Sequence, residues 1–111
     1  MADTGKPRLK LPESVKAGEP FAIKTLISHP MESGQRKDAQ GNPIPRRIIN
    51  RFTCTAGDRE VFAVDLHPAI AANPYLAFWC RLDRPTELVF TWIDDGGETW
   101  TARQQVEVVP A

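Results

Sequence analysis

Ten prolines and seven glycines divide this chain of 111 residues into short segments. Proline interrupts the hydrogen bonds of a helix and glycine weakens it, and no long window free of both shows an apolar period of 3.6 residues. Long helices are therefore excluded as the main element. Because 111 residues is the length of one ordinary domain, we predict a single domain over residues 1–111, with residues 1–6 flexible.

Within these segments apolar and polar residues alternate at a period of two, which is typical of strands with one buried face. Phe21, Ile23 and Ile27, for example, share one face of their segment. Seven such runs predict an all-β fold, an immunoglobulin-like β-sandwich of about seven antiparallel strands. The runs cover residues 8–11, 21–29, 48–55, 60–67, 76–82, 88–92 and 99–109, and Asp95-Gly96-Gly97 predicts a hairpin turn before the last.

Residues 30–47 form a connection that is too long for an ordinary hairpin loop, and long loops in compact domains are usually functional. The residues around Gln40-Gly41-Asn42 predict a small hairpin within it. Its basic side chains are a candidate docking loop for an acidic partner or an oxyanion, because arginine binds such groups with two parallel hydrogen bonds. The alternative is a solvated loop whose charges are offset by neighbouring carboxylates. The docking loop consists of Arg36, Lys37, Arg46 and Arg47.

A second connection, residues 68–75, has no charged side chain. Apolar loops exposed on a surface tend to be partner sites, so we predict an interface here, with folding back over the end of the sandwich as the alternative. The interface candidates are Pro68, Ile70, Ala71, Asn73, Pro74 and Tyr75.

Charge and hydropathy narrow the function further. Fourteen basic and fourteen acidic residues give a formal net charge of zero, which argues against a nucleic-acid-binding protein. No stretch approaches the roughly 18 apolar residues that a membrane helix needs. The polar N-terminus does not resemble a secretory signal peptide.

Candidate chemistry is sparse. His29, His67, Cys54 and Cys80 are the right residue types for a metal site, as in an immunoglobulin-like redox metalloprotein, but they lack the short spacing of metal ligands. Structural histidines that bond to backbone groups are the favoured interpretation. Both cysteines are predicted to face the core, where burial disfavours the thiolate, and a disulfide between them stays open. We predict no catalytic residues, no metal and no cofactor.

Several long segments nevertheless resemble one family. Residues 26–38 (LISHPMESGQRKD), 44–54 (IPRRIINRFTC), 65–75 (DLHPAIAANPY) and 90–97 (FTWIDDGG) are similar to the SoxZ family, and the resemblance runs from about Pro7 to Val108. The family implies an immunoglobulin-like sandwich that is a subunit of the sulfur carrier complex of thiosulfate oxidation. Cys80 is not part of the family pattern, which weakens the idea of a disulfide.

The resemblance implies a partner as well as a fold. A SoxZ subunit pairs with SoxY, which carries the sulfur intermediate on a cysteine in a glycine-rich C-terminal segment. Other enzymes of the pathway make transient contacts with the pair. This chain ends Val108-Val109-Pro110-Ala111 without such a glycine-rich segment, so we expect it to be the non-catalytic subunit of an obligate heterodimer with SoxY. The expected location is the periplasm, with export on the signal peptide of SoxY.

Overall fold

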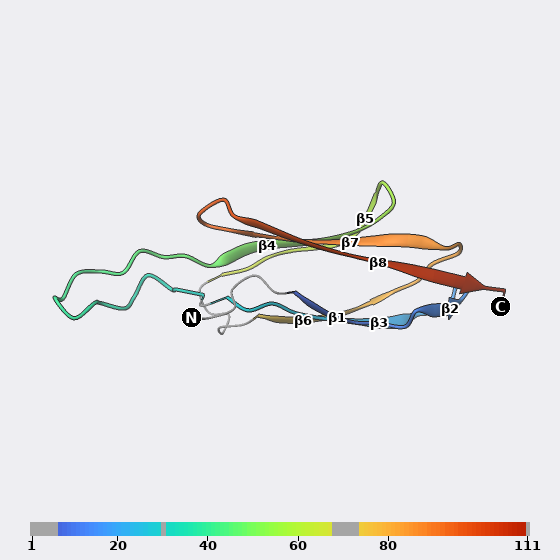
Figure 1. Cartoon of the computed structure of the whole chain (residues 1–111), viewed down its shortest axis with the longest axis horizontal. Helices are drawn as coiled ribbons and strands as arrows, with labels where there is room; N and C mark the ends of the chain where they lie inside the picture. The colour runs from blue at the N-terminus through green and yellow to red at the C-terminus, as the bar shows by residue number, and fades with distance from the viewer. Residues whose placement is uncertain (1–6, 30, 68–73, 111) are drawn as a thin grey trace.

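The computed structural model describes residues 7–29, 31–67 and 74–110. Its strands form two facing layers, which confirms the predicted all-β, immunoglobulin-like sandwich (Figure 1). The residues expected to be flexible, 1–6, lie outside the described part. The strands are β1 (Arg8–Lys10), β2 (Ser14–Lys16), β3 (Phe21–Leu26), β4 (Ile49–Ala56), β5 (Arg59–Asp65), β6 (Tyr75–Cys80), β7 (Thr86–Asp94) and β8 (Thr99–Val109).

One sheet has the order β1-β3-β6 and the other the order β2-β8-β7-β4-β5. Strand β2 is an addition to the predicted seven, and it pairs with β8 in parallel, whereas every other strand pair is antiparallel. The sequence of this strand has a single apolar residue, the buried Val15, so no alternation of apolar residues marks it, whereas Leu9 and Leu11 mark the run over residues 8–11. Among the described residues no helix is long and apolar enough to cross a membrane.

The core between the sheets is rich in aromatic rings. Phe52 of β4 lies at its centre, with ring centroids 5.1 Å from Trp92 of β7 and 5.9 Å from Phe78 of β6. Phe62 of β5 stacks on Phe78 with a centroid distance of 4.3 Å, so this pair joins the two sheets along one side. Buried aromatic rings contribute strongly to stability, and paired rings add about 0.5–1.5 kcal/mol each. Phe21, Ile23 and Ile27 are also buried, so the inward face predicted for their segment is correct.

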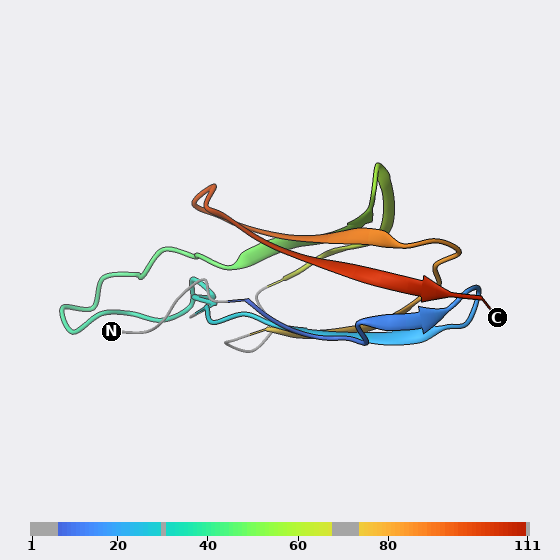
Figure 2. The ribbon, with the colours of Figure 1, turned by 45° about the vertical axis from the view of Figure 1, so that its right-hand side comes forward.

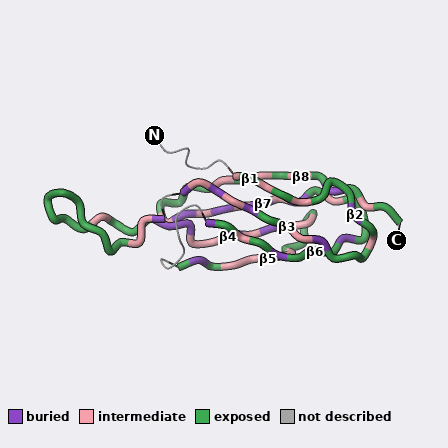
Figure 3. The backbone as a smooth tube through the Cα atoms, turned by 90° about the horizontal axis from the view of Figure 1, so that it is seen from below, coloured by how far each residue is buried: buried purple, intermediate pink, exposed green. Residues whose placement is uncertain are grey.

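Residues 31–47, which we call the arm, leave the sandwich between β3 and β4 and extend along its long axis (Figures 1 and 2). Backbone hydrogen bonds between Glu32 and Arg47 close its base, at 2.7 and 2.8 Å. Most of the arm beyond that base is exposed (Figure 3). At the tip, Oδ1 of Asp38 accepts hydrogen bonds of 2.9 Å from the backbone N–H groups of Gln40 and Asn42, which confirms the predicted hairpin.

Candidate functional site

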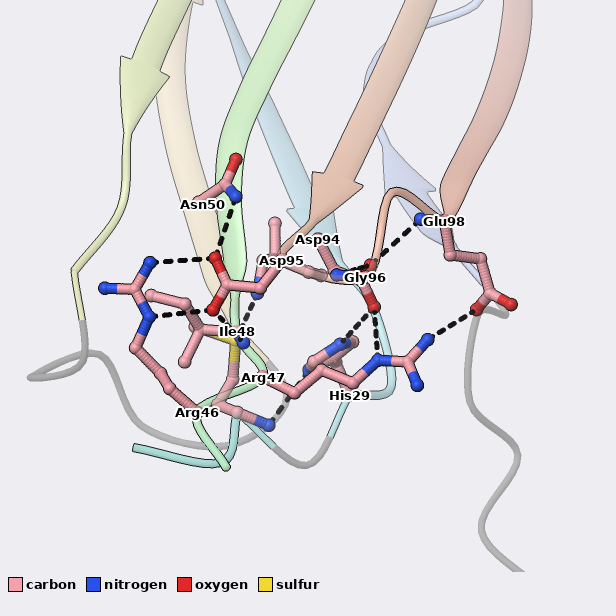
Figure 4. Close-up of polar contacts among 11 residues, drawn as sticks. His29, Arg46, Arg47, Ile48, Asn50, Asp94, Asp95, Gly96 and Glu98 are labelled. Carbon is pink, nitrogen blue, oxygen red and sulfur yellow. Dashed lines mark hydrogen bonds and ion pairs between the residues drawn. The ribbon is translucent and has the colours of Figure 1, made fainter. Parts of the chain in front are cut away.

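A buried carboxylate at the end of β7 holds the base of the arm (Figure 4). Asp94 is 2% exposed, and its Oδ2 accepts hydrogen bonds from Nε of Arg47 at 3.0 Å and Nε2 of His29 at 3.3 Å. Its Oδ1 accepts from the backbone N–H groups of Gly96 and Glu98 in the turn before β8. Burial alone would raise the pKa of Asp94, but the hydrogen bonds from Arg47 and His29 outweigh it and lower the pKa.

The next residue binds the second arginine of the arm. Asp95 accepts two hydrogen bonds of 2.8 Å from Nε and Nη2 of Arg46, the paired geometry that makes arginine–carboxylate contacts strong. It also accepts from Nδ2 of Asn50 at 2.9 Å and from the backbone N–H of Ile48 at 3.1 Å. Burial opposes ionisation, yet these donors lower the pKa of Asp95 to about 2.

His29 connects the arm to the core. Its Nδ1 accepts a hydrogen bond of 2.9 Å from the backbone N–H of Met31, so the neutral ring carries its proton on Nε2 and donates it to Asp94. The ring lies edge-on to Trp100, with centroids 5.6 Å apart. This arrangement agrees with the structural histidine favoured by the sequence.

Close approach explains two glycines at the arm base. Gly34 has a φ of +87°, and a Cβ there would lie 3.0 Å from Cβ of Arg46. A Cβ on Gly96 would lie 3.1 Å from the guanidinium carbon of Arg47. Both arginines of the base therefore pack against backbone that has no side chain.

The four residues of the docking loop divide into two pairs. Arg46 and Arg47 lie at the base and bind the aspartates, with about half of each side chain still exposed. Arg36 and Lys37 lie further along the arm, where Nε of Arg36 donates to Oε2 of Glu32 at 2.9 Å. Arg36 lowers the pKa of Glu32 through this contact. Three of the four cations thus bind carboxylates of this chain, and their docking role stays a prediction.

Asp95-Gly96-Gly97 was interpreted only as a hairpin turn, so Asp94 and Asp95 were missed as partners of the arm arginines. Asp94 does cap that turn, but it also faces the arm, since Ile49 of β4 is opposite Asp94 in the antiparallel pair. Two arginines before one strand and two aspartates at the end of its neighbour are the signal that could have predicted these contacts.

Two of the interface candidates lie within the described residues. The carbonyl of Pro74, which is buried, accepts a hydrogen bond from the backbone N–H of Ile27 at 3.4 Å, and the side chain of Tyr75 is 58% exposed. Trp79, on the same outward face of β6, is 73% exposed and was not singled out in the sequence. The other candidates, Pro68, Ile70, Ala71 and Asn73, lie outside the described residues.

The cysteines are buried and carry free thiols. Burial, with a smaller contribution from neighbouring Cys80, raises the pKa of Cys54 to about 12. Burial also raises the pKa of Cys80, although the charge of Arg59 opposes part of this. A high pKa disfavours the nucleophilic thiolate, as predicted. Within the described ranges, no group of three or more histidine, cysteine or acidic side chains could hold a metal ion, and His67 is exposed.

Comparison with known proteins decides the family. A family model described as sulphur oxidation protein SoxZ matches residues 9–105. The chain belongs to the SoxZ family. Membership confirms the resemblance found in the sequence and implies a role in sulfur oxidation with SoxY, within a family of generally non-catalytic carrier subunits. No curated protein matches this SoxZ-family chain.

Solved structures show the same fold at low sequence identity. A superoxide reductase (neelaredoxin) from Ignicoccus hospitalis is 22% identical with a TM-score of 0.73, over 96% of this chain and 82% of its own. The sulfur carrier protein SoxY from Chlorobium limicola f thiosulfatophilum is 17% identical with a TM-score of 0.65, over 93% and 78%. A putative superoxide reductase from Thermotoga maritima is 18% identical with a TM-score of 0.71, over 93% and 85%. These likenesses establish the immunoglobulin-like fold alone.

Proposed function

We propose that this chain is the non-catalytic partner of SoxY in a heterodimeric sulfur carrier. SoxY holds the covalently bound sulfur intermediate, and the pair presents it to the enzymes of thiosulfate oxidation in the periplasm. The observation that carries the proposal is the SoxZ family match over residues 9–105. The pKa of about 12 for Cys54 supports a subunit that does not use this thiol as a nucleophile.

The fixed base of the arm supports a role in presentation. Its base is closed by two backbone hydrogen bonds and by the ion pairs of Arg46 with Asp95 and Arg47 with Asp94. An exposed element that is ordered before binding loses less entropy on association. The arm is therefore suited to contact enzymes that approach the sulfur carrier.

Reconstitution tests the function. SoxY is supplied to the purified thiosulfate-oxidising enzymes with and without this chain, and thiosulfate consumption is measured. We expect turnover to require the chain and to saturate at one copy per SoxY. Equal turnover without the chain would reject the proposal. Metal analysis of the purified chain tests the metalloprotein alternative, which stoichiometric iron or copper would favour.

A further inference from the structure

The outer face of the sheet β1-β3-β6 combines aromatic and cationic side chains. Alternate residues of a strand point to the same face, and on these strands one set is packed into the core while the other faces outward. Trp79 and Tyr75 are 73% and 58% exposed on this face. The outward set, which we call the outer face, consists of Arg8, Lys10, Ala22, Lys24, Leu26, Tyr75, Ala77 and Trp79.

The strand register brings the two kinds of side chain together. Lys24 is opposite Ala77 of β6 and opposite Lys10 of β1, and Leu26 is opposite Tyr75. A shallow hollow of about 300 Å³ lies between them, lined by Lys10, Lys24, Leu26 and Tyr75 among others. The hollow therefore brings cations of β1 and β3 beside Leu26 and Tyr75.

The charge of this face is one-sided. Its eight positions carry three cations and no carboxylate, although the whole chain has equal numbers of acidic and basic residues. Glu60 of β5 borders Trp79 on the far side of β6, together with Arg59 and Arg81. A second copy of this chain docked through the same face would place cations against cations, which is unfavourable. The face is complementary to a different protein, one with acidic residues around an apolar surface.

We propose that the outer face is the surface through which this chain binds SoxY, with Trp79 and Tyr75 as anchors and Lys24 bound to a carboxylate of SoxY. This inference rests on the proposed function. Tryptophan and tyrosine dominate the binding energy of protein interfaces, and a tryptophan this exposed fits a surface that a permanent partner covers. Strand β6 is also an edge strand, whose free backbone groups are usually shielded in a stable protein. Tyr75 connects this face to the interface segment predicted from the sequence.

The test is co-expression of the full chain with tagged SoxY, followed by titration of the purified subunits. Trp79→Ser is expected to weaken SoxY binding by about thirtyfold or more, as loss of an interface anchor does. Lys24→Glu is expected to weaken it most at low ionic strength, because salt screens charge pairs. Matched controls lie on the other sheet: Val109→Ser, at a side chain 44% exposed, and Lys16→Glu, both expected to change affinity by less than about twofold.

The outcomes separate the surface from the function. If the wild-type chain binds SoxY and both outer-face variants bind equally well, the surface is wrong and the proposed function stands. If the wild-type chain does not bind SoxY, the proposed function fails and this inference fails with it. Thermal melting of each variant checks that it folds. If Trp79→Ser lowers the melting temperature, the SoxY affinity of Lys24→Glu decides whether the outer face is the interface. A wild-type homodimer that Trp79→Ser dissociates would overturn SoxY as the occupant.

Discussion

At the scale of single residues, Asp94 joins segments that are distant in the sequence. Its four hydrogen bonds connect His29 after β3, Arg47 of the arm and the turn before β8. A buried carboxylate is stable only when its oxygens are fully hydrogen-bonded, and here both oxygens have two donors each. Asp94 is therefore one of the side chains of the sandwich that fix the position of the arm, together with Asp95.

Asp94→Asn tests this dependence. The amide keeps the shape of the carboxylate but presents an NH₂ group where two donors now converge, and it loses the charge that Arg47 faces. Hydrogen bonds to charged groups contribute about 1.5–3 kcal/mol, so we expect the free energy of unfolding to fall by roughly 2–3 kcal/mol in denaturant titrations. Asp58→Asn, at an exposed position of the β4–β5 turn, is the control and should change it by less than about 0.5 kcal/mol. Equal values for both variants would contradict the role of Asp94.

Asp95 makes the stability of the folded chain depend on pH, and the direction of this dependence follows from its pKa. Its pKa is about 2 in the folded chain, below the value of about 3.9 expected in the unfolded chain. The folded state thus gains stability from the ionised form above pH 4 and loses it as the pH falls through about 2. We expect the stability difference between wild type and Asp95→Asn, measured by denaturant titration from pH 5 to pH 2, to shrink as the pH falls. A difference that stays constant over this range would contradict the ion pair with Arg46.

At the scale of elements, the arm is a hairpin whose base is fixed while its tip is solvated. The backbone pair between Glu32 and Arg47 is continued by the ion pairs with β7. Exposed ion pairs contribute little to stability by themselves. Here, however, the carboxylate of Asp94 is buried, and Arg46 binds Asp95 with two hydrogen bonds. The arm therefore has a stable base and an accessible end.

Gly34→Ala is expected to loosen the arm base. An added Cβ would approach Cβ of Arg46 to 3.0 Å at a backbone angle that favours glycine. Gly41→Ala is the matched control, because Gly41 also has a positive φ but no atom lies within 4 Å of an added Cβ. We expect the Glu32 and Arg47 amides to exchange hydrogen about tenfold faster in Gly34→Ala, corresponding to about 1.4 kcal/mol. Equal exchange in the two variants would show that the contact with Arg46 is unimportant.

Arg36 and Lys37 permit a test of docking that keeps the backbone pair of Glu32 with Arg47 and the aspartate contacts of the base, and removes only the ion pair of Arg36 with Glu32. Neither contacts Asp94 or Asp95, so replacing both by alanine removes charge from the exposed half of the arm. If this half docks an acidic enzyme surface, turnover of the reconstituted pathway should slow several-fold at low ionic strength and recover toward wild type as salt is added. Turnover that matches wild type at every salt concentration would reject the docking loop.

At the scale of the whole molecule, alternation predicted the sandwich because burial in a two-layer fold imposes a period of two. It placed Ile23, Ile27 and Cys54 in the core correctly. It could not predict strand β2, which has only one apolar residue. It also could not predict the binding of Asp94 and Asp95 to the arm, because these contacts depend on the register of β4 with β7. The exposure of Trp79 also needed the structure, since alternation shows that a side chain faces outward but not that the face is uncovered.

The pairing with SoxY is tested most directly by the molar mass of the complex in solution. Equimolar SoxY and this chain, of 12.4 kDa, are mixed and measured by light scattering after size exclusion. We expect one species whose mass is the sum of one copy of each subunit, stable on dilution. Two separate peaks with the masses of the free subunits would contradict the assignment of this chain as the partner of SoxY.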